Sequence, residues 1–261
     1  MKNSTLKIFL IIAFISLLCG CFSTHETEVI QGAGYKNSKI QWGFKKIEGK
    51  CPEVPSQWSE LLKKYDGFYT GDTASKKLYL TFDEGYENGM TARILDILKK
   101  ENVTAAFFIT GSYLKTQKEL VLRMVNEGHI VGNHTRNHPS MPEVLSDKKL
   151  MEEISSLNDG FFSLTSLNMK YLRPPKGEFS ERTLAISQKM GYKTILWSNA
   201  YVDWVKNGNT KQNAFNKVTK YLHGGCIILL HAVSEENTEA LSEIISFARE
   251  KGYTFVSLDD L

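Results

Sequence analysis

The fold is decided by the stretch Leu78-Tyr79-Leu80-Thr81-Phe82-Asp83-Glu84-Gly85, a short apolar run that ends in two acidic residues and a glycine. The length and composition of the apolar run predict a buried strand. The segment after it carries Ile94, Leu95 and Leu98, whose spacing places them on one face of a helix. Together the two segments predict one strand–helix unit of an α/β protein.

The same alternation continues to the end of the chain. Further apolar runs that predict strands lie at residues 104–109, 129–132, 171–172, 194–197, 227–230 and 253–256. Helical patterns separate them, with Leu120, Met124 and Val125 in one segment, Leu150, Ile154, Leu157 and Phe161 in the next, and three more at residues 184–190, 214–222 and 241–248. This alternation predicts a (β/α) barrel of about seven parallel strands. In such a barrel the active site forms at the C-terminal ends of the strands.

Size and charge limit the classes of protein that need to be considered. The chain has 261 residues, of which 42% are hydrophobic, and this is enough for one catalytic domain with an extension. Its formal net charge is +3, and no run of lysine or arginine exceeds two residues. A charge this weak and dispersed is against a nucleic-acid partner, while a mildly basic enzyme would tolerate an anionic cell-wall polymer.

Residues 1–21 have the pattern of a lipoprotein-type signal peptide. Lys2 and Lys7 lead into a nearly unbroken apolar run at residues 8–18, which is too short for a bilayer span of about 20 residues. Leu18-Cys19-Gly20-Cys21 follows and resembles a lipobox, in which Cys21 would be lipidated. The alternatives are an uncleaved signal anchor and cleavage by an ordinary signal peptidase. Each of the three predicts export to the cell envelope.

Residues 22–75 are expected to form a tether and a wrapping extension ahead of a catalytic domain at residues 76–261. The mixed polar composition of residues 22–50 predicts a flexible spacer, whereas the aromatic side chains at residues 51–70 predict packing on the main domain. Behind the signal only two cysteines remain, Cys51 and Cys226. They could pair after export, but the apolar strand that Cys226 opens favours a buried free thiol.

Polar side chains gather where the predicted strands end. The first strand is followed by Asp83, Glu84 and Glu87, the third by His134 and His138, the fourth by Arg173, the fifth by Asp203 and Trp204, and the next ends in His231. Singly, each has a plain structural alternative: Asp83 as a helix cap, Glu84 as a solvated first-turn acid, and His231 as a buried core histidine. Their convergence on one end of the barrel favours a catalytic site.

His134 and His138 are spaced four residues apart. On a helical turn both imidazoles would point the same way, which is the arrangement by which two neutral nitrogens hold one metal ion. A divalent ion held by two histidines and a carboxylate keeps a position open for water and lowers the pKa of that water. Zinc suits such ligands best, and magnesium, manganese or cobalt are alternatives.

Five ordered motifs resemble those of the NodB-type polysaccharide deacetylases. They are Leu80-Thr81-Phe82-Asp83-Glu84-Gly85, Gly132-Asn133-His134 with His138, Leu172-Arg173-Pro174-Pro175, Asp203-Trp204, and Ile228-Leu229-Leu230-His231. Within that family the chain looks most like the delta-lactam-biosynthetic de-N-acetylases. This likeness lies in three motifs: Phe82-Asp83-x-Gly85-Tyr86-Glu87-Asn88-Gly89, residues 171–175 and Val202-Asp203-Trp204. The resemblance covers residues 78–261 and implies the deformed barrel of the NodB-homology fold.

The resemblance also implies roles for individual residues. Asp83 would be the general base, oriented by Arg173, and His231 the general acid. His134 and His138 would be metal ligands. Glu84 stands where the family usually has a second aspartate as third ligand, and Ala200 where it often has an aspartate that tunes the acid histidine, which leaves Asp203 as the nearby carboxylate. Substrate-binding roles would fall to Tyr86, Pro174 and Trp204.

The activity implied by the resemblance is metal-dependent N-deacetylation of N-acetylmuramic acid in peptidoglycan, so that muramic delta-lactam can form in spore cortex. An N-acetylmuramoyl-L-alanine amidase would first remove the peptide, and a lipid anchor would hold the enzyme on the outer face of the membrane of a spore-forming bacterium. One alternative is a peptidoglycan N-acetylglucosamine or chitin-type deacetylase. The other, from a different class, is a non-catalytic wall-glycan-binding protein.

Overall fold

The computed structural model of the chain describes residues 34–205 and 210–261. The predictions of a signal peptide at residues 1–21, of lipidation at Cys21, and of a spacer over residues 22–33 lie outside the described residues. None of the helices in the described ranges is both long and apolar enough to cross a membrane.

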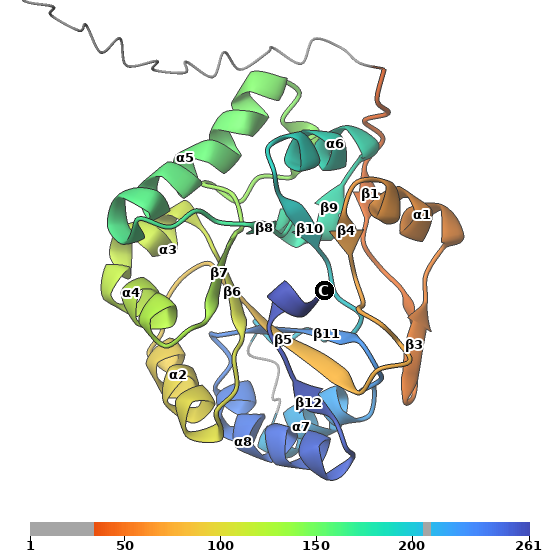
Figure 1. Cartoon of the computed structure of the whole chain (residues 1–261), viewed down its shortest axis with the longest axis vertical. Helices are drawn as coiled ribbons and strands as arrows, with labels where there is room; N and C mark the ends of the chain where they lie inside the picture. Colours follow the sequence, from red (N-terminus) through yellow and green to blue (C-terminus); the bar gives the residue numbers. More distant parts are fainter. Residues whose placement is uncertain (1–33, 206–209) are drawn as a thin grey trace, which may run out of the picture. The chain divides into compact units, whose positions relative to one another are not determined.

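The described residues are organised around one curled parallel sheet (Figure 1). Its strand order is β11-β5-β6-β7-β8-β10-β4, and β12 also pairs with β5. The bounds are β4 (Gly67–Phe68), β5 (Lys77–Glu84), β6 (Ala106–Ile109), β7 (Ile130–Asn133), β8 (Tyr171–Leu172), β10 (Lys193–Ile195), β11 (Cys226–His231) and β12 (Thr254–Phe255). Seven of these are the predicted strands. The eighth, β4, comes from the extension and pairs in parallel with β10.

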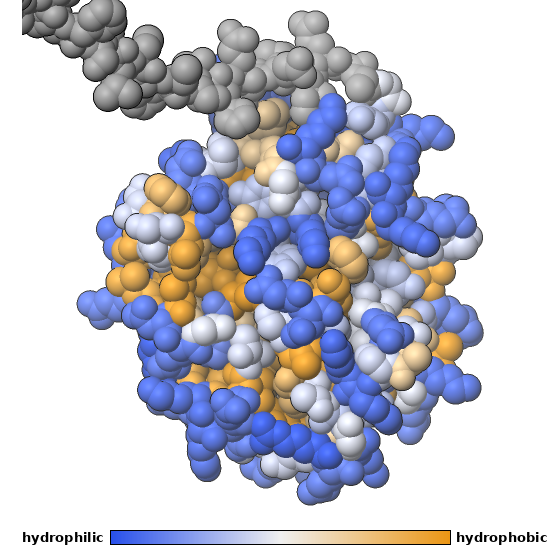
Figure 2. Space-filling model, in the orientation of Figure 1, coloured by the Kyte–Doolittle hydropathy of each residue, from blue (hydrophilic) through white to orange (hydrophobic). Residues whose placement is uncertain are grey.

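Helices surround the sheet as expected for βα units (Figure 1). They are α2 (Met90–Glu101), α3 (Gly111–Thr116), α4 (Lys118–Asn126), α5 (Asp147–Thr165), α6 (Glu181–Lys189), α7 (Lys211–Thr219) and α8 (Glu235–Glu250), with short 3-10 turns η1 (Met141–Glu143), η2 (Pro175–Gly177) and η3 (Leu258–Asp260). The predicted apolar face of α5 is confirmed, since Leu150, Ile154, Leu157 and Phe161 are its buried residues. Figure 2 shows hydrophilic residues along much of the edge of this view, most clearly along its lower side, where α7 and α8 lie.

The barrel is deformed, as predicted. In residues 34–205 and 210–261, the two end strands of the sheet order, β4 and β11, do not pair with each other. Isolated bridges span the gap instead, pairing Asn199 with Ile228 and Thr70 with Cys226. Cys226 is buried, and both it and Cys51 are free thiols, which supports the buried thiol rather than the disulfide.

Side chains of β5 alternate between the two faces of the sheet, and this alternation places the site. Tyr79 belongs to a cluster of buried residues with Phe108 of β6 and Ile227 of β11, which fill the inside of the barrel. Phe82, on the opposite face, stacks on Phe107 under the helices. Because successive strand residues point to opposite faces, Asp83 shares the inward face and Glu84 the outward one.

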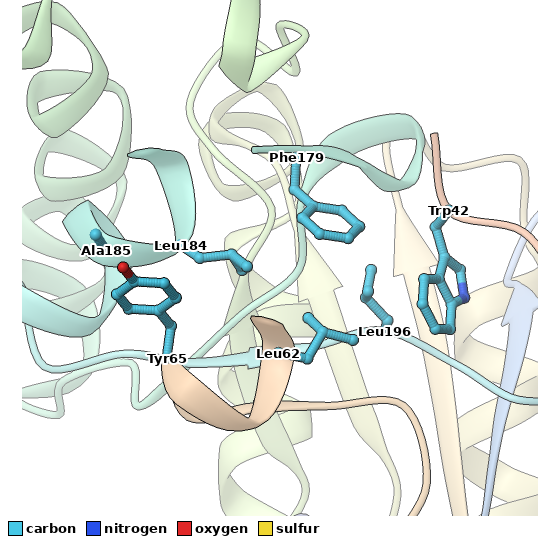
Figure 3. Packing of buried hydrophobic residues seen from close by; sticks show 7 residues of the cluster. All are labelled: Trp42, Leu62, Tyr65, Phe179, Leu184, Ala185 and Leu196. Carbon is cyan, nitrogen blue, oxygen red and sulfur yellow. The ribbon is translucent and has the colours of Figure 1, made fainter. Parts of the chain in front are cut away.

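The extension is more ordered than its composition predicts. A flexible spacer was expected up to residue 50, but residues 40–53 contain β1 (Ile40–Gln41), β2 (Lys45–Ile47) and β3 (Lys50–Glu53), followed by α1 (Ser56–Lys64). β1 pairs with β9 (Glu178–Phe179). The prediction is wrong over this part because Trp42 anchors the segment, buried beside Phe179 and Leu196 in the cluster of Figure 3. One large aromatic side chain can bury enough apolar surface to order a segment that is otherwise polar.

Candidate active site

A pocket of about 490 Å³ opens at the C-terminal ends of β5, β7 and β11. The described residues that line it come from the strand ends, the following loops and the extension: Gln41, Asp83, Gly85, Tyr86, His134, His138, Lys176, Trp197, Trp204, Leu229, His231 and Val233. A larger cavity of about 650 Å³ lies elsewhere, among lysines and the ends of α7 and α8. The described residues that line this cavity include neither histidine nor aspartate, so the chemistry is assigned to the first pocket.

Asp83 is held by a buried arginine. Arg173 is fully buried, and its Nη1 donates to Asp83 Oδ1 at 2.8 Å, while Nη2 donates to Thr81 Oγ1 at 2.9 Å. Its guanidinium also lies 4.1 Å from the centre of the Phe108 ring. Burial raises the pKa of Asp83. The positive charge of Arg173, together with smaller effects from nearby histidines, lowers the pKa by more than burial raises it, so the net shift is downward. Asp83 is therefore an ionised carboxylate fixed in direction.

His134 and His138 are brought together by a loop and not by the helical turn that was expected. The loop follows β7, and both Thr135 and His138 have left-handed backbone, with φ of 63° and 57°. Asn133 Oδ1 accepts from the Thr135 amide, and Thr135 Oγ1 from the His138 amide. These polar contacts stabilise the unusual backbone and place the two imidazole rings 4.8 Å apart.

Both imidazoles are prepared to act as neutral ligands. His134 Nδ1 lies 2.8 Å from the carbonyl oxygen of Arg173, and since a carbonyl can only accept, Nδ1 carries the proton. The lone pair of Nε2 is thereby left facing Asp83, whose Oδ2 is 3.5 Å away. Burial lowers the pKa of His134 to about 4, and burial likewise lowers the pKa of His138. A metal ligand must be deprotonated, so these shifts favour metal binding.

The donor atoms at this end of the pocket fit a divalent ion. In the described ranges, no group of three or more histidine, cysteine, aspartate or glutamate side chains meets the geometry of a complete metal site. Two neutral imidazole nitrogens, with the free oxygen of Asp83 beside them, are nevertheless the donors that zinc and similar ions use in open sites. His134 and His138 are the residues that would hold the ion.

The geometry is against Glu84 as a third ligand. Its side chain points to the outer face of β5, where it is fully buried and accepts a hydrogen bond from Thr91 Oγ1 at 3.3 Å. It does not line the pocket. Burial raises the pKa of Glu84 well above its usual value, and the nearby Glu87 raises it further. The prediction fails because the alternation of strand side chains places this carboxyl under α2, on the side of the sheet opposite to the histidines.

His231 lies directly beside Asp83, because the two residues are partners in the register of β11 and β5. Asp203, whose side chain is fully buried, accepts from His231 Nδ1 at 2.7 Å and from the His231 amide at 2.8 Å. Burial lowers the pKa of His231, but the hydrogen bond and charge of Asp203 raise it more. Asp203 thus provides the carboxylate partner that Ala200 cannot.

Asn237 is a site residue that the sequence did not reveal. Its Nδ2 donates to Asp203 Oδ2, and its Oδ1 accepts from Tyr201. It lies in the first turn of α8, well after the last motif, and an asparagine in a polar helix start gives no pattern to detect. Asn237 therefore helps to hold the Asp203 carboxylate in the orientation that contacts His231.

Aromatic side chains form the outer wall of the pocket. Tyr86 is 60% exposed and Trp204 50% exposed, and the Trp204 ring lies 4.7 Å from the ring of His231. Exposed aromatic rings of this kind offer flat apolar surfaces to sugar rings. Pro174, by contrast, is buried and does not line the pocket, so the geometry is against its predicted contact with substrate. Gln41 and Lys176 do line it and were not predicted.

Comparison with known proteins agrees with this geometry. Residues 70–195 match the model of the family described as polysaccharide deacetylase. The chain is 44% identical to the peptidoglycan-N-acetylmuramic acid deacetylase PdaA of Bacillus subtilis, over 88% of this chain and 89% of that protein. It is 32% identical to a peptidoglycan-N-acetylglucosamine deacetylase of Bacillus cereus, over 83% of this chain and 78% of the relative.

Solved structures show the same relationship. The structure of Bacillus subtilis PdaA, a family 4 carbohydrate esterase, superposes with a TM-score of 0.84 and covers 87% of this chain and 97% of that one. A family 4 carbohydrate esterase from Bacillus anthracis, 47% identical, superposes with a TM-score of 0.74 over the same shares. The chain belongs to the polysaccharide deacetylase family.

Proposed function

We propose that this enzyme removes the acetyl group from N-acetylmuramic acid residues of peptidoglycan. The observation that carries the proposal is the pairing of Asp83 and His231 across one strand register, the first held by a buried arginine and the second by a buried aspartate. The relative with the corresponding name, 44% identical over most of both chains, supports muramic acid as the sugar.

The two residues divide the proton transfers of amide hydrolysis. Asp83 is ionised and accepts a proton from the water that attacks the acetamide carbonyl. His231, whose pKa is raised by the hydrogen bond and charge of Asp203, donates a proton to the departing amine nitrogen, without which the amide C–N bond does not break. Acetate and a free amine result. A divalent ion held by His134 and His138 would polarise the carbonyl and acidify water.

The wider setting that we propose rests on the prediction of a lipoprotein signal in residues 1–21 and on what the family resemblance implies. A lipoprotein anchor at Cys21 would hold the enzyme outside the membrane, close to nascent peptidoglycan. Muramic acid freed of its peptide by an amidase would be the substrate, and a deacetylated amine beside the lactyl carboxyl can then close into a delta-lactam. This order of reactions fits the spore cortex of a spore-forming bacterium.

Product analysis tests the proposal. Peptidoglycan trimmed with an N-acetylmuramoyl-L-alanine amidase is incubated with the enzyme, with and without chelator, digested to disaccharides and measured by mass spectrometry. We expect deacetylated muramic acid, unchanged N-acetylglucosamine, and no product with chelator. Deacetylated glucosamine beside intact muramic acid would reject the proposal in favour of the second candidate, the N-acetylglucosamine deacetylase, which the 32% identical Bacillus cereus relative supports.

A non-catalytic glycan-binding protein is the third candidate. Binding alone requires neither an ionised carboxylate nor a protonated imidazole aimed at the same point. The buried partners Arg173 and Asp203 stabilise those two protonation states at the pocket, which is the reason to favour an enzyme.

A further inference from the structure

One cation faces the pocket without a known task. Lys176, in the turn η2, is exposed and lines the pocket together with Asp83 and His138. Among the described residues that line this pocket it is the one lysine or arginine. Arg173 lies behind the pocket wall, fully buried and committed to Asp83.

Its backbone is held in a conformation that side chains rarely adopt. Lys176 has φ of 60° and ψ of 5°, in the left-handed region, and Gly177 follows with φ of 67°. Glycine is required at the second position, because a Cβ there would lie 2.9 Å from the Trp197 ring and 3.1 Å from the side chain of Trp42. A left-handed lysine persists only where its surroundings impose it, and such positions cluster at binding sites.

The N-terminal extension imposes this conformation. Gln41 Nε2 donates to the carbonyl oxygen of Lys176 at 2.7 Å, and the Trp42 amide donates to the carbonyl oxygen of Gly177 at 2.8 Å. Trp42 is itself fixed by its indole Nε1, which donates to the Trp197 carbonyl at 3.0 Å. Gln41 and Trp42 lie outside residues 70–195, the part of the chain that matches the family model.

The ammonium group of Lys176 is available to a ligand. No ion pair joins it to a carboxylate in residues 34–205 or 210–261. Glu178 directly follows the turn, and Glu143 is close enough for the charge of Lys176 to act on it, but the ion pairs of both carboxylates are with Lys39, at 3.5 and 2.8 Å.

We propose that Lys176 binds the lactyl carboxylate of muramic acid and that the segment containing Gln41 and Trp42 positions it to do so. The inference rests on the proposed function. Muramic acid differs from glucosamine by a lactyl ether on the carbon next to the acetamide, so its carboxylate lies only a few bonds from the group that Asp83 and His231 act on. An ammonium and a carboxylate form a charge-assisted hydrogen bond. The carboxylate is free only after the peptide is removed, so Lys176 would make the enzyme act after the amidase.

The test compares two forms of one substrate. Amidase-trimmed glycan strands carry free lactyl carboxylates, and methyl esterification of the same strands removes their charge. Acetate release gives kcat/KM on each form for the full chain and for Lys176→Gln, Lys176→Glu and Lys176→Arg. Lys148→Gln, which alters an equally exposed lysine on α5, is the matched control.

We expect the parent enzyme to prefer the carboxylate form by about 10- to 100-fold, the range of one hydrogen bond to a charged group. Lys176→Gln should lose this preference, Lys176→Glu should favour the ester, and both Lys176→Arg and Lys148→Gln should keep the parent preference. Gln41→Ala should weaken the preference by a smaller factor, because it frees the turn and leaves the charge in place.

Two results would overturn the inference, and they differ in what they leave standing. If the parent deacetylates muramic acid but Lys176→Gln keeps its preference for the carboxylate, the inference fails and the proposed function stands. If every variant and the parent release acetate only from glucosamine residues, both fail together.

Discussion

Asp83 and His231 are neighbours across two paired strands, yet their supporting partners come from different parts of the molecule. On the base side, Arg173 crosses the inside of the barrel and is held by Thr81 and by the Ile195 carbonyl. On the acid side, Asp203 lies in a loop after β10, beside the exposed Trp204, and is held by Asn237 of α8. The base side is thus built into the core, and the acid side is assembled from a loop and a helix start.

Because of this difference, substitutions on the two sides should affect different properties of the enzyme. A change on the base side leaves a charge unpaired in a dry environment and should affect both folding and catalysis. A change on the acid side should mainly alter the protonation of His231, because its imidazole is partly exposed whereas Arg173 is fully buried.

The largest expected effect is on the base itself. Asp83→Asn keeps the shape and a hydrogen-bond acceptor for Arg173 but cannot take a proton, so kcat/KM should fall by about 10³- to 10⁴-fold. Acetate release from trimmed peptidoglycan measures it, with the thermal midpoint of unfolding as the control for folding. A variant within tenfold of the parent would remove Asp83 from the role of base.

Replacing Arg173, the buried partner of Asp83, should reduce the free energy of unfolding as well as activity. Arg173→Met leaves Asp83 buried without its partner, and the free energy of unfolding should drop by about 3–5 kcal/mol. Urea denaturation followed by far-ultraviolet circular dichroism measures the loss. The double variant Arg173→Met with Asp83→Asn removes the unpaired charge and should recover part of it. A loss below about 1 kcal/mol for the single variant would mean that the pair is not buried as described.

The acid side should respond through pH. Asp203 raises the pKa of His231, and the reaction needs His231 protonated, so activity is present below that pKa and lost as pH rises through it. Asp203→Asn lowers the pKa of His231, and the basic limb of the kcat/KM profile should move to lower pH. Asn237→Ala should move it in the same direction by less. If the basic limb of the profile does not move in Asp203→Asn, Asp203 does not set the pKa of the general acid His231.

The smallest effect on stability and metal binding is expected for a change of Glu84, the residue that follows the base Asp83. Burial raises the pKa of Glu84 well above its usual value, which favours the neutral form, and glutamine has a similar shape, so Glu84→Gln should change stability by less than about 1 kcal/mol. Metal content after dialysis, measured by mass spectrometry of the metal, should stay at the parent level in Glu84→Gln and be lost in His134→Ala. Loss of the metal in Glu84→Gln would restore Glu84 as a ligand.

Much of the barrel could be predicted because its strands and helices carry strong periodic patterns. The buried face of α5 was predicted from side-chain spacing, and β5 from its apolar run, although the strand continues to Glu84, two residues beyond the predicted end. β4 was missed because Gly67–Phe68 lies in the extension, where the aromatic side chains predicted packing on the main domain but no alternation of strands and helices. Trp42 was missed for a related reason, because a single anchor in a polar segment leaves no pattern in composition.

Site residues that lie within sequence motifs could be predicted. Those that reach the site because distant segments pack together could not. The predicted convergence is confirmed for Asp83, His134, His138, Arg173, Asp203 and His231, whose catalytic and metal-binding roles stay predictions. Glu84 was misplaced because motif order ignores which face of a strand a side chain takes. Gln41, Lys176 and Asn237 contribute through packing between the extension, a tight turn and a late helix, and such contacts are set by tertiary structure alone.

The most direct test of the central claim is whether the two sides act as one unit. A double-mutant cycle on kcat/KM with Asp83→Asn, His231→Gln and the combined variant, each measured on trimmed peptidoglycan, gives the answer. If base and acid serve the same bond cleavage, each single change should disable it and the combined variant should lose little more than the worse single variant. Losses that multiply, so that the combined loss equals the product of the two single losses, would contradict the account.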